Sequence, residues 1–386
     1  MADDREKGLS ILFRREVAKI RSFEAESTEA RKTTIFSGVS MTVPASPPTP
    51  PSPLASPRGE SCFALVELTS MHFCDIIPSR KAVDTMKEQN RSMKLYAPKY
   101  YKSFKCIADK CEHSCCIGWE IGVDGETLER YECLGEGYGD AVRKSISYDG
   151  DPHFELCADD RCPHLNEQGL CRIILNLGEG YLCSICREHP RFYNYTDVVE
   201  VGLGMSCPEA ARIILASHDY AVMEKIGEVS ADSDEIEFNG RIIRGNIYTI
   251  LGDGSLCYGE RLAKIYDDYD ISPQDDEAWL KKLADLEYLD ERHRDLFMNY
   301  SSLSRPVGVD QYLERFLAYL IYRHCTEALD AEDFVLRLSF CLFCERLAAS
   351  LIASEGASSL NEVAKLASVI SEEIEYSEEN TEALTY

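Results

Sequence analysis

The placement of the cysteines is the sequence feature that most constrains how this chain can fold. Eleven of the 17 cysteines fall between residues 93 and 207, a stretch that is less than a third of the 386-residue chain. In a reducing compartment, cysteines at short spacings are more often metal ligands than disulfide partners. The clustering therefore predicts one metal site, or a pair of sites, within this stretch.

Two sets of cysteines carry the spacing of metal ligands. Short spacing lets one loop direct two thiolates at a common centre, and a remote loop can complete the shell. Four thiolates would hold zinc or an iron–sulfur cluster, so the spacing leaves the metal and the number of sites open. We take as candidate ligands Cys106, Cys111, Cys115 and Cys116 from the first set, and Cys162, Cys171, Cys186 and Cys207 from the second.

Other possible ligands are weaker. Adjacent Cys115 and Cys116 cannot readily point the same way, so one is expected to bind and the other to pack. His113 and His164 lie close to candidate ligands, but such a histidine more often hydrogen-bonds to a ligand than binds the metal. Cys341 and Cys344 lie in an apolar stretch of helical periodicity and are expected to be packed thiols.

The chain divides into three predicted parts, and the fold class is mainly α. Residues 1–92 are a low-complexity, disordered leader with seven prolines between Pro44 and Pro57, or a mis-assigned start ahead of Met93. Residues 93–218 form a Cys-rich metal-binding domain with short irregular or β elements. Residues 219–386 form an acidic helical domain, with 15 basic and 35 acidic residues.

Apolar residues recur at helical spacing in several segments of the second half. The pattern predicts helices over residues 208–226, 311–325, 332–354 and 360–375. Residues 237–250 are compatible with either a hairpin or the start of a helix.

Charge and missing motifs exclude several functions. A net charge of −26 argues against a nucleic-acid binder, which needs positive charge to neutralise phosphates. The longest charge-free apolar run near the C-terminus, residues 338–344, is too short to span a bilayer, and no signal peptide opens the chain. No P-loop, GxSxG elbow or Rossmann fingerprint is present. We expect a cytoplasmic protein without nucleic-acid partners.

Several short motifs follow one another in a distinctive order. They are residues 96–101 (YAPKYY), 111–116 (CEHSCC), 118–121 (GWEI), 162–165 (CPHL), 169–171 (GLC), 206–212 (SCPEAAR) and 371–380 (SEEIEYSEEN). This series resembles the flagellin lysine-N-methylases of the FliB family, which have a Cys-rich zinc- or iron-chelating motif. The similarity covers about residues 93–386.

The resemblance implies an enzyme that transfers methyl groups from S-adenosylmethionine to lysine side chains of flagellin in the cytoplasm, before export. It further implies that the Cys-ligated centre is an iron–sulfur cluster, 4Fe-4S rather than zinc. Two alternatives remain open. One is a non-catalytic zinc- or iron-binding protein whose helical domain docks a partner, and the other is a different modification enzyme on the same scaffold.

Lysine methylation requires a neutral amine, although the free lysine side chain has a pKa near 10.4. A carboxylate could help to remove the proton. Asp124, Glu120 and Glu209 lie beside the cysteine motifs and are the candidate catalytic residues, although each could simply be a solvated or capping carboxylate. Trp119 is the candidate cofactor-binding residue, since its ring could stack on a sulfonium or a lysine cation, with core packing as the alternative.

Overall fold

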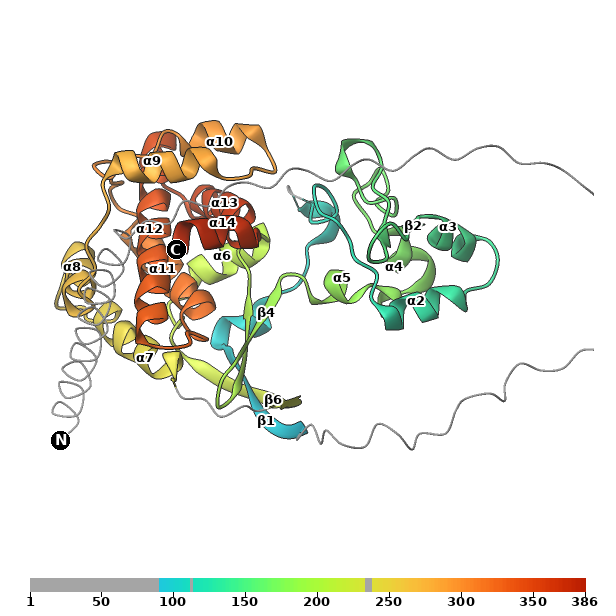
Figure 1. The fold of residues 1–386 in the computed structure, drawn as a ribbon, viewed down its shortest axis with the longest axis horizontal. Coiled ribbons are helices and arrows are strands. Elements are labelled where there is room, and N and C mark those ends of the chain that lie inside the picture. Colours follow the sequence, from blue (N-terminus) through green and yellow to red (C-terminus); the bar gives the residue numbers. More distant parts are fainter. Residues whose placement is uncertain (1–89, 112–113, 233–237) are drawn as a thin grey trace, which may run out of the picture. The chain divides into compact units, whose positions relative to one another are not determined.

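The computed structural model describes residues 90–386, except 112–113 and 233–237 (Figure 1). Residues 1–89 of the predicted leader, and His113, lie outside the described residues. The strands are β1 (Asn90–Pro98), β2 (Ile146–Ser147), β3 (His153–Phe154), β4 (Arg191–Tyr195), β5 (Val199–Leu203) and β6 (Met223–Asp232). The α-helices are α2 (Gly125–Glu132), α3 (Tyr138–Lys144), α4 (Arg172–Leu177), α5 (Ser184–Glu188), α6 (Pro208–Ala216), α7 (Gly240–Leu251), α8 (Tyr258–Asp268), α9 (Asp276–Asp285), α10 (Glu291–Phe297), α11 (Asp310–His324), α12 (Ala331–Glu355), α13 (Leu360–Ile370) and α14 (Glu378–Thr385).

Five short helical turns complete the described chain. Four are 3-10 turns and the last is a π-helical turn that continues α13; they are η1 (Lys99–Ser103), η2 (Ala108–Lys110), η3 (Ala158–Asp160), η4 (Glu179–Tyr181) and η5 (Ser371–Glu375). The protein is thus mainly helical with a small mixed sheet, which confirms the helical part of the predicted fold class.

The main sheet has four strands in the order β4-β5-β1-β6. β1 is parallel to β5 and antiparallel to β6, and β4 and β5 form an antiparallel hairpin. All of β5 is buried, as expected for a central strand rich in valine.

The helix predicted over residues 208–226 is wrong in its second half. α6 ends at Ala216, and β6 begins at Met223 and pairs with β1 along its whole length. β1 offers an open edge, and the backbone hydrogen bonds of this pairing override the local helical pattern.

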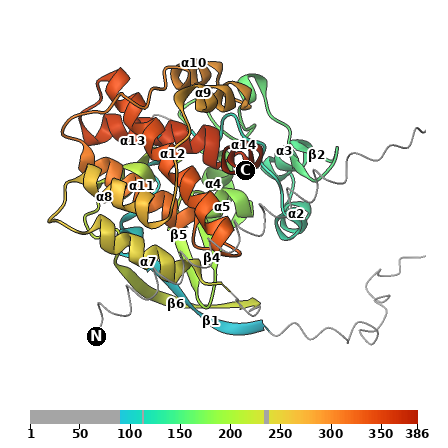
Figure 2. The ribbon, with the colours of Figure 1, turned by 60° about the vertical axis from the view of Figure 1, so that its left-hand side comes forward.

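We call helices α6 to α14 the helical body. In it, α11 and α12 run side by side, with α6 and α13 against them (Figures 1 and 2). α12 is buried almost all round, as a helix with apolar residues on every side should be. The predicted helices at 311–325, 332–354 and 360–375 are confirmed, and residues 237–250 contain α7 rather than a hairpin. Cys341 and Cys344 are fully buried in α12, as expected for packed thiols.

A buried ion pair attaches α7 to the central strand. Arg244 donates to both carboxylate oxygens of Glu200 on β5, at 2.7 and 2.9 Å, and also to the hydroxyl of Thr326. Both charged side chains are at most 5% exposed. Because neither charge can reach water, each depends on the other for its stability.

The cysteine-rich segment is inserted between β1 and β4, and we call residues 99–190 the insertion. It has a small core of its own, in which Cys162 and Cys183 pack with Tyr131, Phe154 and Ile173. The first residues of the insertion and the segment that follows β4 pack into the core of the helical body, which includes Tyr100, Leu203 and Met205. The domain boundaries at residues 93 and 218 stay predictions.

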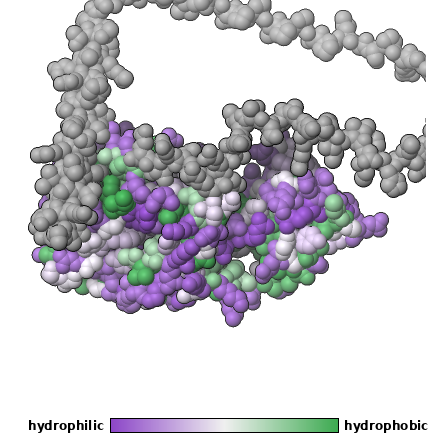
Figure 3. All heavy atoms as spheres, turned by 90° about the horizontal axis from the view of Figure 1, so that it is seen from below, coloured by the Kyte–Doolittle hydropathy of each residue, from purple (hydrophilic) through white to green (hydrophobic). Residues whose placement is uncertain are grey.

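One face of the protein can be judged by its hydropathy. The face shown in Figure 3 is mostly hydrophilic, and hydrophobic residues occupy only small areas of it. Among the described helices, none combines the length and apolar character needed to cross a bilayer.

Candidate functional site

Four cysteines from two remote segments form what we call the first thiol cluster. Cys115 interacts electrostatically with Cys106 and Cys207, and Cys207 with Cys106 and Cys111. Cys207 immediately precedes α6, and its sulfur accepts hydrogen bonds from the backbone amides of that helix. Burial nevertheless raises the pKa of Cys207 to about 11.

The second thiol cluster lies within the insertion. Its members interact electrostatically with one another and comprise Cys116, Cys162, Cys171, Cys183 and Cys186. Burial raises the pKa of Cys162 to about 12, whereas a hydrogen bond from Cys186 lowers the pKa of Cys183. This cluster forms part of the insertion's core, so the thiols replace the apolar side chains that a larger domain would use.

The adjacent residues Cys115 and Cys116 belong to different clusters. They are hydrogen-bonded to each other, and this bond lowers the pKa of Cys116 to about 7. Burial opposes the shift, whereas a hydrogen bond from Ser114 and the charge of Arg161 also lower the pKa. The thiolate is the form that binds metals. The two adjacent cysteines thus contribute to both clusters, and one of them is readily ionised.

The chemistry of the two clusters suits thiolate-bound metals, but their geometry does not form a coordination shell. No disulfide links the cysteines of the described ranges, so the sulfurs are not consumed as cystines. Over those same ranges, no three Cys, His, Asp or Glu side chains are arranged to hold a metal ion. The sulfur donors are therefore of the kind that binds a soft metal or an iron–sulfur cluster, but they are not arranged around a common point. The ligand assignments stay predictions.

His164 is placed as a structural residue. Its two ring nitrogens each pair at 2.9 Å with a hydroxyl group, that of Tyr138 and that of Ser145. The ring is buried and packs edge-on against Phe154, and burial lowers its pKa to about 4. Because both ring nitrogens are hydrogen-bonded, His164 stabilises the core beside Cys162 and has no nitrogen left to bind a metal.

Asp124 caps two helices of the insertion. One of its oxygens accepts from the backbone amide of Thr127 in α2, and the other from that of Ser184 at the start of α5. Burial opposes ionisation, yet these hydrogen bonds hold the pKa of Asp124 well below its usual range. The carboxylate thereby fixes the segment that carries Cys183 and Cys186, and its predicted catalytic role stays a prediction.

The other two candidate carboxylates lie near the first thiol cluster in sequence. Glu209 stands in the first turn of α6 and binds Arg212 with both oxygens, at 2.7 and 2.8 Å. Glu120 is exposed. The structure therefore does not bring Asp124, Glu120 and Glu209 together in one constellation through any hydrogen bond or ion pair that it records among the described residues.

Trp119 meets a residue from the far end of the chain. Its ring packs edge-on against Tyr376, with 5.7 Å between the ring centroids. Tyr376 directly follows η5. The guanidinium of Arg323 stacks on its ring, with 4.4 Å between Cζ of Arg323 and the ring centroid. The motif around Trp119 and the motif 371–380, both predicted from the resemblance, are thus in contact.

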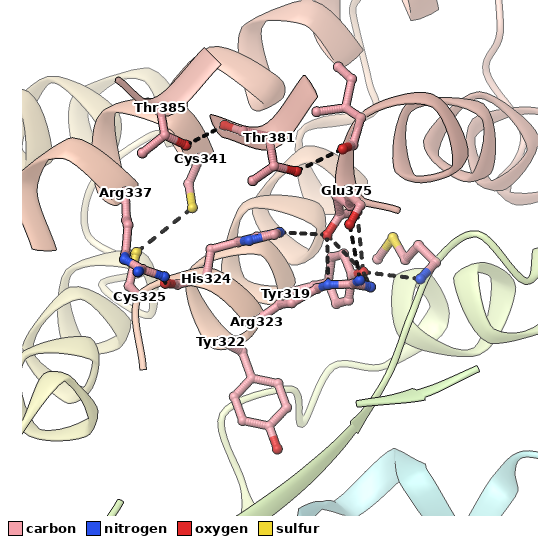
Figure 4. Close-up of polar contacts among 12 residues, drawn as sticks. Tyr319, Tyr322, Arg323, His324, Cys325, Arg337, Cys341, Glu375, Thr381 and Thr385 are labelled. Atoms are coloured by element: carbon pink, nitrogen blue, oxygen red, sulfur yellow. Dashed lines mark hydrogen bonds and ion pairs between the residues drawn. The ribbon is translucent and has the colours of Figure 1, made fainter. Parts of the chain in front are cut away.

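A buried polar network holds η5 against the rest of the protein. Tyr319, Arg323 and His324 of α11 converge on the carboxylate of Glu375, as Figure 4 shows. The Tyr319 hydroxyl also accepts from the backbone amide of Met205, two residues before Cys207. The same contacts that position η5 therefore position the segment that carries Cys207.

Sequence reasoning missed several residues of this site. Cys183 is not among the predicted ligands, although it lies inside the second thiol cluster, and its Cys-x2-Cys spacing with Cys186 is a signal that could have identified it. Tyr376 and Glu375 were noted only as part of a motif. A run of five glutamates in ten positions that nevertheless keeps apolar Ile374 could have indicated buried carboxylates.

Comparisons with known proteins agree with the resemblance. The chain is 30% identical over 138 residues to proteins named Lysine-N-methylase from Salmonella typhimurium and Salmonella choleraesuis, a stretch that covers 33% of this chain and 34% of each relative. It is 29% identical over 131 residues to "Flagellar biosynthetic protein FliU" of Salmonella muenchen, which covers 77% of that protein. The resemblance to the flagellin lysine-N-methylase family is thereby confirmed at the level of the family.

The matched stretch is only about a third of the lysine-N-methylases. No family model and no solved structure matches the chain.

Proposed function

We propose that this protein transfers methyl groups from S-adenosylmethionine to lysine side chains of flagellin in the cytoplasm. The observation that carries the proposal is the similarity to proteins named Lysine-N-methylase. The relative named for flagellar biosynthesis favours a flagellar substrate. The acidic surface of a chain with net charge −26 would attract a lysine-bearing protein.

We also propose that the insertion carries a Cys-ligated centre, an iron–sulfur cluster in preference to zinc. The ligands would come from Cys106, Cys111, Cys115 and Cys207 in the first thiol cluster, and from Cys116, Cys162, Cys171 and Cys186 in the second. The deprotonated thiol is the metal-binding form, so metal loading would release protons from buried groups such as Cys162 and Cys207. Such a centre would supply redox or Lewis-acid chemistry, and it would stabilise the small core of the insertion.

Transfer of a methyl group makes two demands on the chain's own residues. The lysine nitrogen must lose a proton, so that its lone pair can form the N–C bond while the donor's C–S bond breaks and sulfur keeps the electron pair. Among Asp124, Glu120 and Glu209, only Glu120 is exposed, and it is the neighbour of Trp119 in the sequence, whereas the other two are held in hydrogen bonds or an ion pair. We therefore assign Glu120 as the first candidate to take up the proton.

The test is mass spectrometry of flagellin incubated anaerobically with the full-length protein and S-adenosylmethionine. Mass increments of single methyl groups on lysines, absent without the donor, are expected. Iron and sulfide analysis of the anaerobically purified protein tests the centre separately. If metal is present but flagellin gains no methyl groups, the protein is instead a metal-binding protein that docks a partner.

A further inference from the structure

A small cavity lies where the Trp119 segment meets the C-terminal motif. Its volume is about 140 Å³. Three aromatic residues (Trp119, Tyr288 and Tyr376) and three glutamates (Glu287, Glu372 and Glu373) line it. These residues come from the insertion, from the loop before α10 and from the η5 segment, so the cavity exists only because the fold joins three remote parts of the sequence.

The lining selects for a positively charged ligand with an aliphatic stem. Aromatic ring faces attract cations, and a carboxylate that is 7% exposed, as in Glu372, gains most from a cationic neighbour. No lysine or arginine is among the described residues that line the cavity, so its lining carries negative charge only, although Arg323 stacks on Tyr376 and His293 pairs with Glu373 behind it. The volume is well above the roughly 10–15 Å³ of such space that one water needs, so the cavity has room for the end of a lysine side chain.

The walls of the cavity are fixed in place by buried contacts. Glu373 accepts from the backbone amides of Leu289 and Asp290, at 2.8 and 3.2 Å, and bonds to His293 at 2.6 Å. These bonds tie the loop of Tyr288 to η5. Glu373 is therefore a positioning residue.

The aromatic wall is fixed in the same way. Tyr376 lies between the Arg323 guanidinium and the Trp119 ring, and its hydroxyl occupies the space in which Gly204 lacks a side chain. η5 is a π-helical turn, a rare distortion that is frequent at functional sites. The aromatic wall is therefore held in place by contacts from two sides.

We propose that this cavity binds the side chain of the lysine to be methylated, with the ammonium group against the ring of Trp119 and the carboxylate of Glu372. The identity of the ligand as a substrate lysine rests on the proposed function. The preference of the site for a cation follows from its lining alone. Trp119 is three residues from Cys116 in the sequence, so the segment that lines the cavity also carries a cysteine of the second thiol cluster.

The first experiment measures binding without turnover. The full-length protein, purified anaerobically, is titrated with Nα-acetyl-lysine amide and with its uncharged analogue Nα-acetyl-norleucine amide, and binding is followed by ligand-observed NMR. We expect the lysine compound to bind and the norleucine compound not to bind. Equal binding of both compounds, or binding of neither, overturns the inference.

Substitutions then locate the binding site. Trp119→Ala and Glu372→Gln should each weaken binding of the lysine compound about tenfold, a change equivalent to about 1.4 kcal/mol. Trp119→Phe keeps an aromatic ring and should lose less. Glu378→Gln removes one exposed charge of the same acidic segment, outside the cavity, and should leave binding unchanged. Thermal melting of each variant separates lost binding from lost folding, because Trp119→Phe and Glu372→Gln must lose affinity while they melt like the parent.

Competition identifies which cation the cavity takes. S-adenosylmethionine also carries a positive charge, and displacement of the lysine compound by the donor at equal concentration would overturn the assignment to lysine. Methylation assays keep the two proposals apart. If the parent protein methylates flagellin and the cavity variants keep its KM, the inference fails and the function stands; if no methylation occurs but charge-selective binding persists, the function fails and the cation site stands.

Discussion

The insertion and the helical body use the same residue type in opposite ways. In the helical body, Cys325, Cys341 and Cys344 are fully buried among many aliphatic and aromatic side chains, and the sulfurs of Cys325 and Cys341 are 3.8 Å apart. In the insertion, nine residues form the buried core, two of which are Cys162 and Cys183, and three further cysteines pack against it. A single thiol is therefore a small part of the large core of the first region and a greater part of the small core of the second.

Individual glycines of the two regions differ in how closely they are packed. In the helical body and on the central strand, a methyl group added at Gly202, Gly204 or Gly240 would overlap neighbouring atoms. In the insertion, a methyl group added at Gly122 or Gly125 would meet nothing within 4 Å. The contrast is not complete, since a methyl group at Gly139 of the insertion would lie 2.7 Å from Cβ of Leu134, and one at Gly245 of α7 would meet nothing within 4 Å. The smaller core of the insertion is nevertheless the one whose stability bound metal would affect most.

The largest expected effect separates the cysteines of the two regions. Cys171→Ser should remove metal and open the insertion, because ligation can contribute on the order of 10 kcal/mol to the folding of a small metal domain. Cys344→Ser should leave the metal content intact. Metal analysis and hydrogen exchange of residues 99–190 against residues 310–355 provide the measurements. Retention of the full metal content by Cys171→Ser would show that the second thiol cluster is not a ligand set.

A second pair of variants sharpens this comparison within the insertion. Cys207→Ser changes only the first thiol cluster, and Cys171→Ser only the second. If each cluster holds its own centre, each variant loses part of the metal and the double variant loses all of it. Complete loss in either single variant would mean one shared centre.

The next effect belongs to the helical body alone. Glu375 is a fully buried carboxylate that binds Tyr319 and His324 and pairs with Arg323. Glu375→Ala leaves that guanidinium buried without its partner, so the free energy of unfolding should fall by about 3–5 kcal/mol. Urea denaturation measures the loss, with exposed Glu355→Ala as the matched control. A loss below that of the control would contradict the importance of the network.

The helices could be predicted because their signal is local. The apolar stripes of residues 311–325 and 332–354 are complete within each segment, and both became helices. The sheet could not be predicted, since β1 pairs with strands more than 100 residues away along the chain. Met223, Ile226 and Val229 are spaced three apart, which imitates a helix, and only the open edge of β1 makes this segment a strand.

The sequence predicts which cysteines belong to the candidate site, but not how they divide between the two thiol clusters. Spacing identified the thiols, but Cys115 and Cys116 joined different clusters and Cys207 joined the first set, because these groupings depend on how α6 and the insertion pack. The contact between Trp119 and Tyr376 spans most of the described chain, and no local pattern encodes it.

A smaller effect makes the stability of the helical body depend on pH. Burial raises the pKa of Glu345 to about 7, although Arg305 and Tyr258 favour its ionised form. The folded state holds this proton more tightly than the unfolded state, so the contribution of Glu345 to stability is fully present below pH 4.5 or so and is lost as the pH rises through about 7. Glu345→Gln should remove this dependence and stabilise the protein at pH 8 by on the order of 3 kcal/mol. Urea midpoints at pH 5.5 and pH 8 test the prediction, and an unchanged pH dependence in the variant would refute it.

The smallest effects come from one methyl group added in each region. Gly240→Ala places its methyl group against the carbonyl oxygens of Cys325 and Thr326, the latter at 2.8 Å, and should cost about 1–3 kcal/mol. Gly245→Ala, on the exposed side of the same helix, meets nothing within 4 Å and should stabilise α7 by up to about 1 kcal/mol. Gly122→Ala in the insertion should change the free energy of unfolding by less than about 0.5 kcal/mol. Urea denaturation of the three variants ranks them, and a cost at Gly122 equal to that at Gly240 would show that the insertion is packed as densely as the body.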